Sequence, residues 1–138
     1  MNRILLLEDD LLLAMHYRSV LEDAGYLVYH DVNVESAKET LTEVPIDLVI
    51  TDILICDWDG RPQSSGGLSL MAHLTLNQGE KPKMIAITGT SPSLNLLQHA
   101  ENFDVDVCME KPIESKKLLS EVLRLIGPGS QEQGSGNA

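Results

Sequence analysis

The stretch Ile4-Leu5-Leu6-Leu7-Glu8-Asp9-Asp10 joins four aliphatic residues directly to three carboxylates. An apolar run without polar alternation is typical of a strand that is buried on both faces, as in a parallel sheet. Adjacent carboxylates repel one another and are stabilised by water or by a cation. The stretch therefore predicts a buried first strand whose end carries a cluster of negative charge to the rim of a sheet.

Four further short segments have the same apolar character and predict strands at residues 27–30, 47–52, 83–88 and 105–109. Apolar residues at helical spacing lie between them and predict helices at about residues 11–24, 33–43, 67–77, 91–101 and 119–126. Strands that alternate with helices imply a parallel sheet covered on both faces, with right-handed crossovers. The predicted fold class is α/β, a doubly wound five-stranded parallel sheet.

The length of 138 residues and the hydrophobic content of 43% fit one compact domain. We assign this domain to residues 1–126. Residues 127–138, which read "GPGSQEQGSGNA", are rich in Gly, Ser and Gln and contain no apolar anchor. We therefore expect residues 127–138 to form a disordered tail.

The net charge of −11, from 21 acidic and 10 basic residues, argues against direct binding to nucleic acid or to an anionic membrane surface. No apolar run approaches the length of a membrane span. The two cysteines, Cys56 and Cys108, lack the spacing of a disulfide framework or metal site, so we expect them to be buried thiols. Together these features predict a cytoplasmic protein.

Polar residues follow most of the predicted strands. In an open α/β sheet, ligands bind beyond the carboxyl ends of the strands. Those ends here carry Glu8-Asp9-Asp10, Asp52, Thr88 and Lys111, while Asp31, at the end of the second strand, need not share the site. Any one of them could be an ordinary helix cap or surface residue. Together they predict a site for Mg²⁺, which prefers oxygen ligands, and for a phosphoryl group carried by an aspartate.

Four segments carry a resemblance to a known family: "ILLLEDD", "DLVITD", "MIAITGT" and "CMEKPI". In this order and spacing the sequence resembles a response-regulator receiver domain of two-component signalling, over about residues 2–126. The resemblance implies a flavodoxin-like (β/α)5 fold with strand order 2-1-3-4-5. It also implies a stand-alone receiver without an output domain.

The resemblance assigns a Mg²⁺ site to four residues. Asp9 resembles the direct metal ligand of the acidic pair, and Glu8 resembles the partner that acts through water. Asp52 resembles the phosphoacceptor, which also binds the metal, and Leu54 would contribute its backbone carbonyl. Asp10 lies outside the pair, and we place it at the start of the first helix.

The resemblance assigns the phosphoryl group to a second set of residues. Thr88 resembles the hydroxyl residue that contacts a phosphoryl oxygen. Gly89 resembles the small residue that leaves the phosphoryl group accessible. Lys111, which precedes Pro112, resembles the lysine that pairs with that group.

The implied function is that of a signalling switch. A histidine kinase or phosphotransfer protein would donate a phosphoryl group to Asp52 in a Mg²⁺-dependent step, and the modified surface would bind an unknown downstream protein. In the family, the fourth helix, fifth strand and fifth helix commonly form the output surface. Such a domain is a regulator rather than an enzyme, although it assists its own phosphorylation and dephosphorylation.

The sequence departs from the family pattern at three places. Cys108 occupies the position of the usual aromatic switch residue, three positions before the lysine. Cys56 replaces a proline four positions after the phosphoacceptor. The loop at residues 53–66 is longer than usual, and it is either a mobile insertion or a lid or partner contact anchored by Trp58.

Two alternative functions remain open from the residues. A phosphatase of the haloacid-dehalogenase type would also use an Asp nucleophile, Thr, Lys and Mg²⁺, but it needs a second Asp where this chain has Leu54. An interaction module that keeps only the fold would need none of these groups.

Overall fold

The computed structural model describes residues 2–52, 55–56, 62–63, 70, 73–74, 81–88 and 105–129, with the backbone alone at 55–56, 62–63 and Thr88. The helix predicted at residues 91–101 lies outside this part of the chain. Of the helix predicted at 67–77, only Leu70, His73 and Leu74 are described, and all three are helical.

A parallel sheet forms the centre of the molecule. Its strands, in chain order, are β1 (Arg3–Leu7), β2 (Leu27–Asp31), β3 (Leu48–Asp52), β6 (Lys83–Thr88) and β7 (Val107–Glu110). Their order across the sheet is β2-β1-β3-β6-β7 and all neighbours pair in parallel. The predicted fold class and strand order 2-1-3-4-5 are therefore confirmed.

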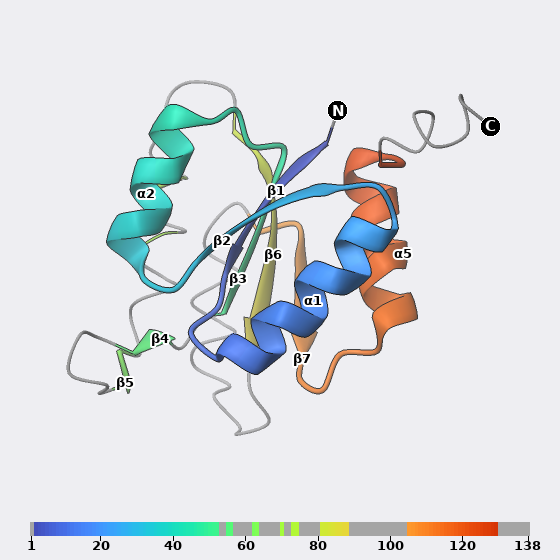
Figure 1. Cartoon of the computed structure of the whole chain (residues 1–138), viewed down its shortest axis with the longest axis horizontal. Coiled ribbons are helices and arrows are strands. Elements are labelled where there is room, and N and C mark those ends of the chain that lie inside the picture. Colours follow the sequence, from blue (N-terminus) through green and yellow to red (C-terminus); the bar gives the residue numbers. More distant parts are fainter. Residues whose placement is uncertain are drawn as a thin grey trace.

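Helices cover both faces of this sheet. Figure 1 shows α1 (Leu11–Asp23) and α5 (Ser115–Ile126) side by side on one face, and α2 (Val34–Glu43) on the other. A second, two-stranded antiparallel sheet pairs β4 (Ile55–Cys56) with β5 (Pro62–Gln63) inside the long loop. None of the described helices combines the length and the apolar character that crossing a membrane would require.

The absence of alternation in the first strand follows from this layering. Ile4 and Leu6 pack into the core beneath α1 and α5, while Leu5 and Leu7 pack into the core beneath α2. All four side chains are at most 1% exposed. Because successive side chains of a strand point to opposite faces, a strand covered on both sides needs apolar residues at every position.

The first two helices begin where the sequence predicts. The Asp10 carboxylate accepts a hydrogen bond from the Leu13 amide at 3.1 Å and caps α1. Asn33 caps α2 in the same way through the Ser36 amide at 2.8 Å. Each such cap typically contributes about 1 kcal/mol. The last helix, α5, begins at Ser115, before Leu119, the first of the apolar residues on which its prediction rests.

The C-terminal end of the described chain packs against the N-terminal strand. The Asn2 side-chain amide donates to the carbonyls of Ile126 and Pro128 at 3.0 and 2.6 Å, and the Tyr26 hydroxyl donates to the Gly127 carbonyl at 2.6 Å. Gly129 is buried. Residues 127–129 are thus held against the domain, while residues 130–138 lie outside the described chain.

We expect Gly129→Ala to lower the free energy of unfolding by roughly 1–3 kcal/mol, because overpacking a close contact displaces its neighbours. A Cβ at this position would lie 2.5 Å from the Gly25 carbonyl carbon, which is backbone and cannot rotate away. Urea denaturation measures the loss. Leu123→Ala, on a side chain that is 52% exposed, serves as the control and should cost much less. Equal stability of Gly129→Ala and wild type would contradict the packing described here.

Candidate functional site

The register of the sheet gathers the predicted polar residues at one edge. Leu7 pairs with Thr51, so Glu8 and Asp52 follow at adjacent strand ends. Asp52 pairs with Ile87, and Thr88 pairs with Glu110, the residue before Lys111. The residues at the ends of β1, β3, β6 and β7 therefore lie at the same rim of the sheet.

Three carboxylates meet at this rim. Glu8, Asp9 and Asp52 each present an oxygen, and these oxygens lie within 4.8 Å of one another. Glu8 is 1% exposed and Asp52 is 5% exposed, whereas Asp9 is half-buried. Carboxylates this close and this poorly solvated repel strongly unless cations compensate them.

Lys111 supplies one compensating charge. Its Nζ lies 2.6 Å from Asp52 Oδ2 and 3.2 Å from Glu8 Oε1. Desolvation by burial lowers the pKa of Lys111, but the hydrogen bond with Asp52 and the charges of Asp52 and Glu8 outweigh it and raise the pKa. Lys111 therefore remains an ammonium at neutral pH and offsets one of the three negative charges.

The negative charge that Lys111 does not offset affects Glu8. Its pKa is raised to about 7, chiefly because burial disfavours the charged carboxylate. The hydrogen bond from the Asp10 amide lowers the pKa, the Asp52 charge raises it and Lys111 lowers it, but burial outweighs the lowering effects. The Asp10 amide donates to Glu8 Oε2 at 3.1 Å. Glu8 Oε1 accepts no hydrogen bond within the described residues, despite its proximity to Lys111.

These features fit a divalent cation. The donors are all carboxylate oxygens, which Mg²⁺ prefers, and Glu8 also has a buried oxygen without a hydrogen bond in the described chain. Asp9, Asp52 and Glu8, as the sequence predicts, could hold the ion. Leu54 and Gly89 lie outside the described residues, and Thr88 reaches the rim with its backbone, while its side chain is not described.

We expect Mg²⁺ to bind more tightly as pH rises, because the Glu8 carboxyl must lose its proton before it can hold the ion, even through water. With a pKa of about 7, affinity should increase by up to about tenfold between about pH 6 and about pH 8. Calorimetric Mg²⁺ titrations measure this increase. The Glu8→Gln variant, which cannot titrate, should show a flatter dependence, and an identical dependence in both proteins would count against the assignment.

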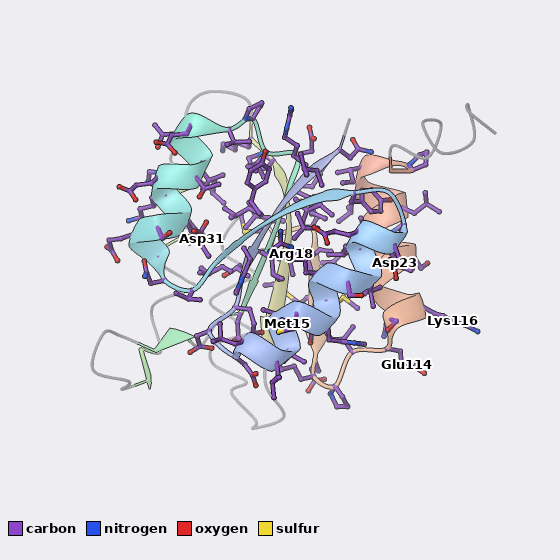
Figure 2. All side chains as sticks on the ribbon, viewed as in Figure 1. Met15, Arg18, Asp23, Asp31, Glu114 and Lys116 are labelled. Atoms are coloured by element: carbon purple, nitrogen blue, oxygen red, sulfur yellow. The ribbon has the colours of Figure 1, made fainter. Side chains whose placement is uncertain are left out.

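The other acidic residues at strand ends have local roles. Asp10 caps α1 and contributes its amide, rather than its carboxylate, to the site. Asp31 accepts hydrogen bonds from the hydroxyls of Ser36 and Thr40 and so lies against α2 (Figure 2). Both assignments agree with the expectation that these two residues stand apart from the metal ligands.

The expectation of a buried thiol at residue 108 is wrong, because Cys108 is exposed. Cys108 lies on β7, the edge strand of the sheet, where Met109 is buried in the core beneath α1 and α5. Since neighbouring side chains of a strand point to opposite faces, Cys108 faces away from that core. The side chains of Cys56 and Trp58 lie outside the described residues.

Sequence reasoning missed one contact of the site. The His30 Nε2 atom lies 2.8 Å from the backbone carbonyl of Glu8. A single histidine without ligand spacing carries no sequence signal of this role. The register of β1 and β2 would have indicated the contact, because His30 pairs with Leu6 and thus lies beside the end of β1.

Comparisons with known proteins agree with this geometry. Residues 4–123 match the family model of the response regulator receiver domain. The response regulator receiver protein CpdR of Brucella abortus (strain 2308) is 33% identical over 127 residues, which cover 91% of this chain and 98% of that protein.

Two solved structures show a similar fold. A CheY-like response regulator receiver domain protein of Methanospirillum hungatei JF-1 has a TM-score of 0.75 at 23% identity, over 90% of this chain and 92% of that one. The signal receiver domain of a modulated diguanylate cyclase from Desulfovibrio desulfuricans G20 has a TM-score of 0.77 at 24% identity, over 91% and 94%.

Proposed function

Because the chain belongs to the response-regulator receiver family, we propose that it is a signalling switch in which Asp52 accepts a phosphoryl group. The observation that carries this proposal is the ion pair of 2.6 Å between Lys111 and Asp52 inside a cluster of three carboxylates. Family membership also favours this function over the haloacid-dehalogenase-like phosphatase.

The proposed chemistry is a nucleophilic displacement at phosphorus. A carboxylate oxygen of Asp52 attacks the phosphorus and forms an acyl phosphate, while the bond from phosphorus to the donor nitrogen breaks and its electron pair leaves with the donor imidazole. Catalysis of such a transfer rests on positioning and on charge neutralisation. Lys111 already faces Asp52 and would pair with the incoming phosphoryl oxygens.

The acidic pair and the threonine complete the proposed machinery. Asp9 and Asp52 would hold Mg²⁺ directly and Glu8 would hold it through water, and the bound ion would supply neutralising positive charge. The Thr88 hydroxyl would donate a hydrogen bond to a phosphoryl oxygen. The same groups would assist hydrolysis of the acyl phosphate and so limit the lifetime of the signal.

The proposed donor is a histidine kinase or a phosphotransfer protein. Leu11, Leu12 and Met15 at the start of α1 are 60%, 79% and 66% exposed, directly after the acidic pair (Figure 2 labels Met15). A cavity of about 420 Å³ lies between α1 and the segment Lys111–Ile113, on the face of α1 that carries Leu13, His16 and Tyr17. Apolar surface next to a reactive group supports docking of a protein rather than of a small phosphodonor.

Phosphorylation would change the charge balance of the rim. It would add close to two negative charges to a site with a single ammonium among the described residues, so Lys111 would move its contact from Asp52 to the phosphoryl group. Lys111 begins the segment that leads into α5, which lies on the output surface that the family uses. This coupling would alter binding of an unknown downstream protein.

Incubation with acetyl phosphate and Mg²⁺, followed by intact mass measurement, tests the proposal. We expect a mass increase of one phosphoryl group. We expect no increase when a chelator removes the metal before the phosphodonor is added. A folded protein that stays unmodified would favour the non-phosphorylated interaction module. Multiple turnover on a phosphomonoester would instead favour the phosphatase.

A further inference from the structure

We propose that His30 is a positioning residue for the metal-binding acidic pair, acting through the backbone carbonyl of Glu8. The inference rests on the proposed function in one respect, since it takes Glu8 and Asp9 to be the Mg²⁺ site.

The contact occurs where the strand ladder ends. The Glu8 amide donates to the Asp31 carbonyl at 3.1 Å, which extends the pairing of β1 with β2 by one residue. Both strands end here, because β1 is followed by α1 from Leu11 and β2, which ends at Asp31, is followed by α2 from Val34. The His30 side chain lies 2.8 Å from the Glu8 carbonyl at this point. A carbonyl oxygen only accepts hydrogen bonds, so Nε2 of His30 must carry the proton and donate.

This hydrogen bond orients both acidic residues. The Glu8 carbonyl belongs to the peptide group that joins Glu8 to Asp9, and a peptide group is planar from one Cα to the next. Fixing the direction of this oxygen therefore fixes the plane on which the Cα atoms of Glu8 and Asp9 both lie. In this way His30, which does not contact the metal, would position the backbone from which the side chains of Glu8 and Asp9 extend.

The other hydrogen bonds of Glu8 within the described part of the chain do not involve this carbonyl. The Asp31 carbonyl holds the Glu8 amide, and the Asp10 amide holds the Glu8 carboxylate. Both of these involve backbone groups and persist when side chains of β2 are changed. The bond from His30 is a side-chain contact to the Glu8–Asp9 peptide group, and substitution of His30 removes it alone.

The test measures Mg²⁺ affinity of the full chain by calorimetry, with the metal alone as the probe. We expect His30→Leu to bind Mg²⁺ about tenfold more weakly, as for other residues that orient metal ligands. His30→Gln keeps an N–H donor at nearly the same reach and should retain most of the affinity. His73→Leu, which removes an exposed histidine from a helix, should match wild type.

Two further readouts separate positioning from a general loss of stability. The amide resonance of Asp9 in metal-free protein should shift in His30→Leu and return toward its wild-type position in His30→Gln. Phosphorylation by acetyl phosphate should be slow in His30→Leu at low Mg²⁺ and approach the wild-type rate at saturating Mg²⁺. A defect in folding alone would not be reversed by restoring an N–H donor in His30→Gln.

Wild-type Mg²⁺ affinity in His30→Leu would overturn the inference, and so would equal losses in His30→Leu and His30→Gln. If His30→Leu fails to fold, His30→Phe keeps a planar ring without a donor and is judged by the same criteria. A wild type that binds Mg²⁺ but accepts no phosphoryl group would refute the proposed function and leave the His30 comparison intact. A wild type that binds no Mg²⁺ would refute the inference itself.

Discussion

Asp52→Asn is expected to abolish phosphoryl transfer from acetyl phosphate. The amide that replaces the carboxylate has nearly the same shape but lacks the anionic oxygen that attacks phosphorus. The variant should remain folded, because it removes one of three crowded negative charges while its carbonyl oxygen can still accept a hydrogen bond from Lys111. Intact mass measurement after incubation with Mg²⁺ should therefore show unmodified protein only.

Asp10→Asn provides the matched control for this change. It also converts an acid at the same rim to an amide, but Asp10 caps α1, and asparagine is an equally good N-cap. We expect this variant to be phosphorylated like wild type. Modification of Asp52→Asn to the wild-type level would place the acceptor elsewhere and contradict the proposed mechanism.

Lys111→Met is expected to impair both stability and transfer. Glu8 and Asp52 are almost fully buried and would lose the ammonium that now contacts them. Removing one partner of a fully buried ion pair costs roughly 3–5 kcal/mol. The Lys111 side chain is 21% exposed, so we expect a smaller loss, roughly 2 kcal/mol in metal-free protein. Phosphorylation should slow by about a hundredfold, as when one charge-stabilising donor is removed.

The pH dependence of this loss identifies its cause. The pKa of Glu8 is about 7, so more of the cluster is neutral at about pH 6 than at about pH 8, and the missing ammonium should matter less at the lower pH. Urea denaturation at both pH values measures the difference. Lys116→Met, on the solvent-facing first turn of α5 (Figure 2), is the control and should change little. A Lys111→Met loss that is equal at both pH values would argue against electrostatic compensation.

The parts of this fold that the sequence predicts are those with a local physical signal. The segment "DLVITD" predicts β3, whose five residues are all buried, because its apolar run Leu48–Ile50 is typical of a strand covered on both faces. Asp10 and Asn33 predict helix starts because a cap acts within three residues of its own position. The site residues follow from the same logic, since parallel strands end at one edge.

The features that the sequence does not predict depend on distant partners. The backbone carbonyls of Gly127 and Pro128 accept hydrogen bonds from the side chains of Tyr26 and Asn2. Every residue has a backbone carbonyl, so the amino-acid composition does not indicate these contacts. His30 reaches Glu8 only through the register of two strands. The exposure of Cys108 follows from the position of β7 at the sheet's edge, which an apolar run does not reveal.

Location of the phosphoryl group on the chain tests the central claim most directly. After reaction with acetyl phosphate and Mg²⁺, borohydride reduces an aspartyl phosphate to homoserine, and peptide mass mapping then identifies the residue that carried it. We predict conversion at Asp52 alone. Conversion at another residue, or no conversion in protein that binds Mg²⁺, would contradict the account.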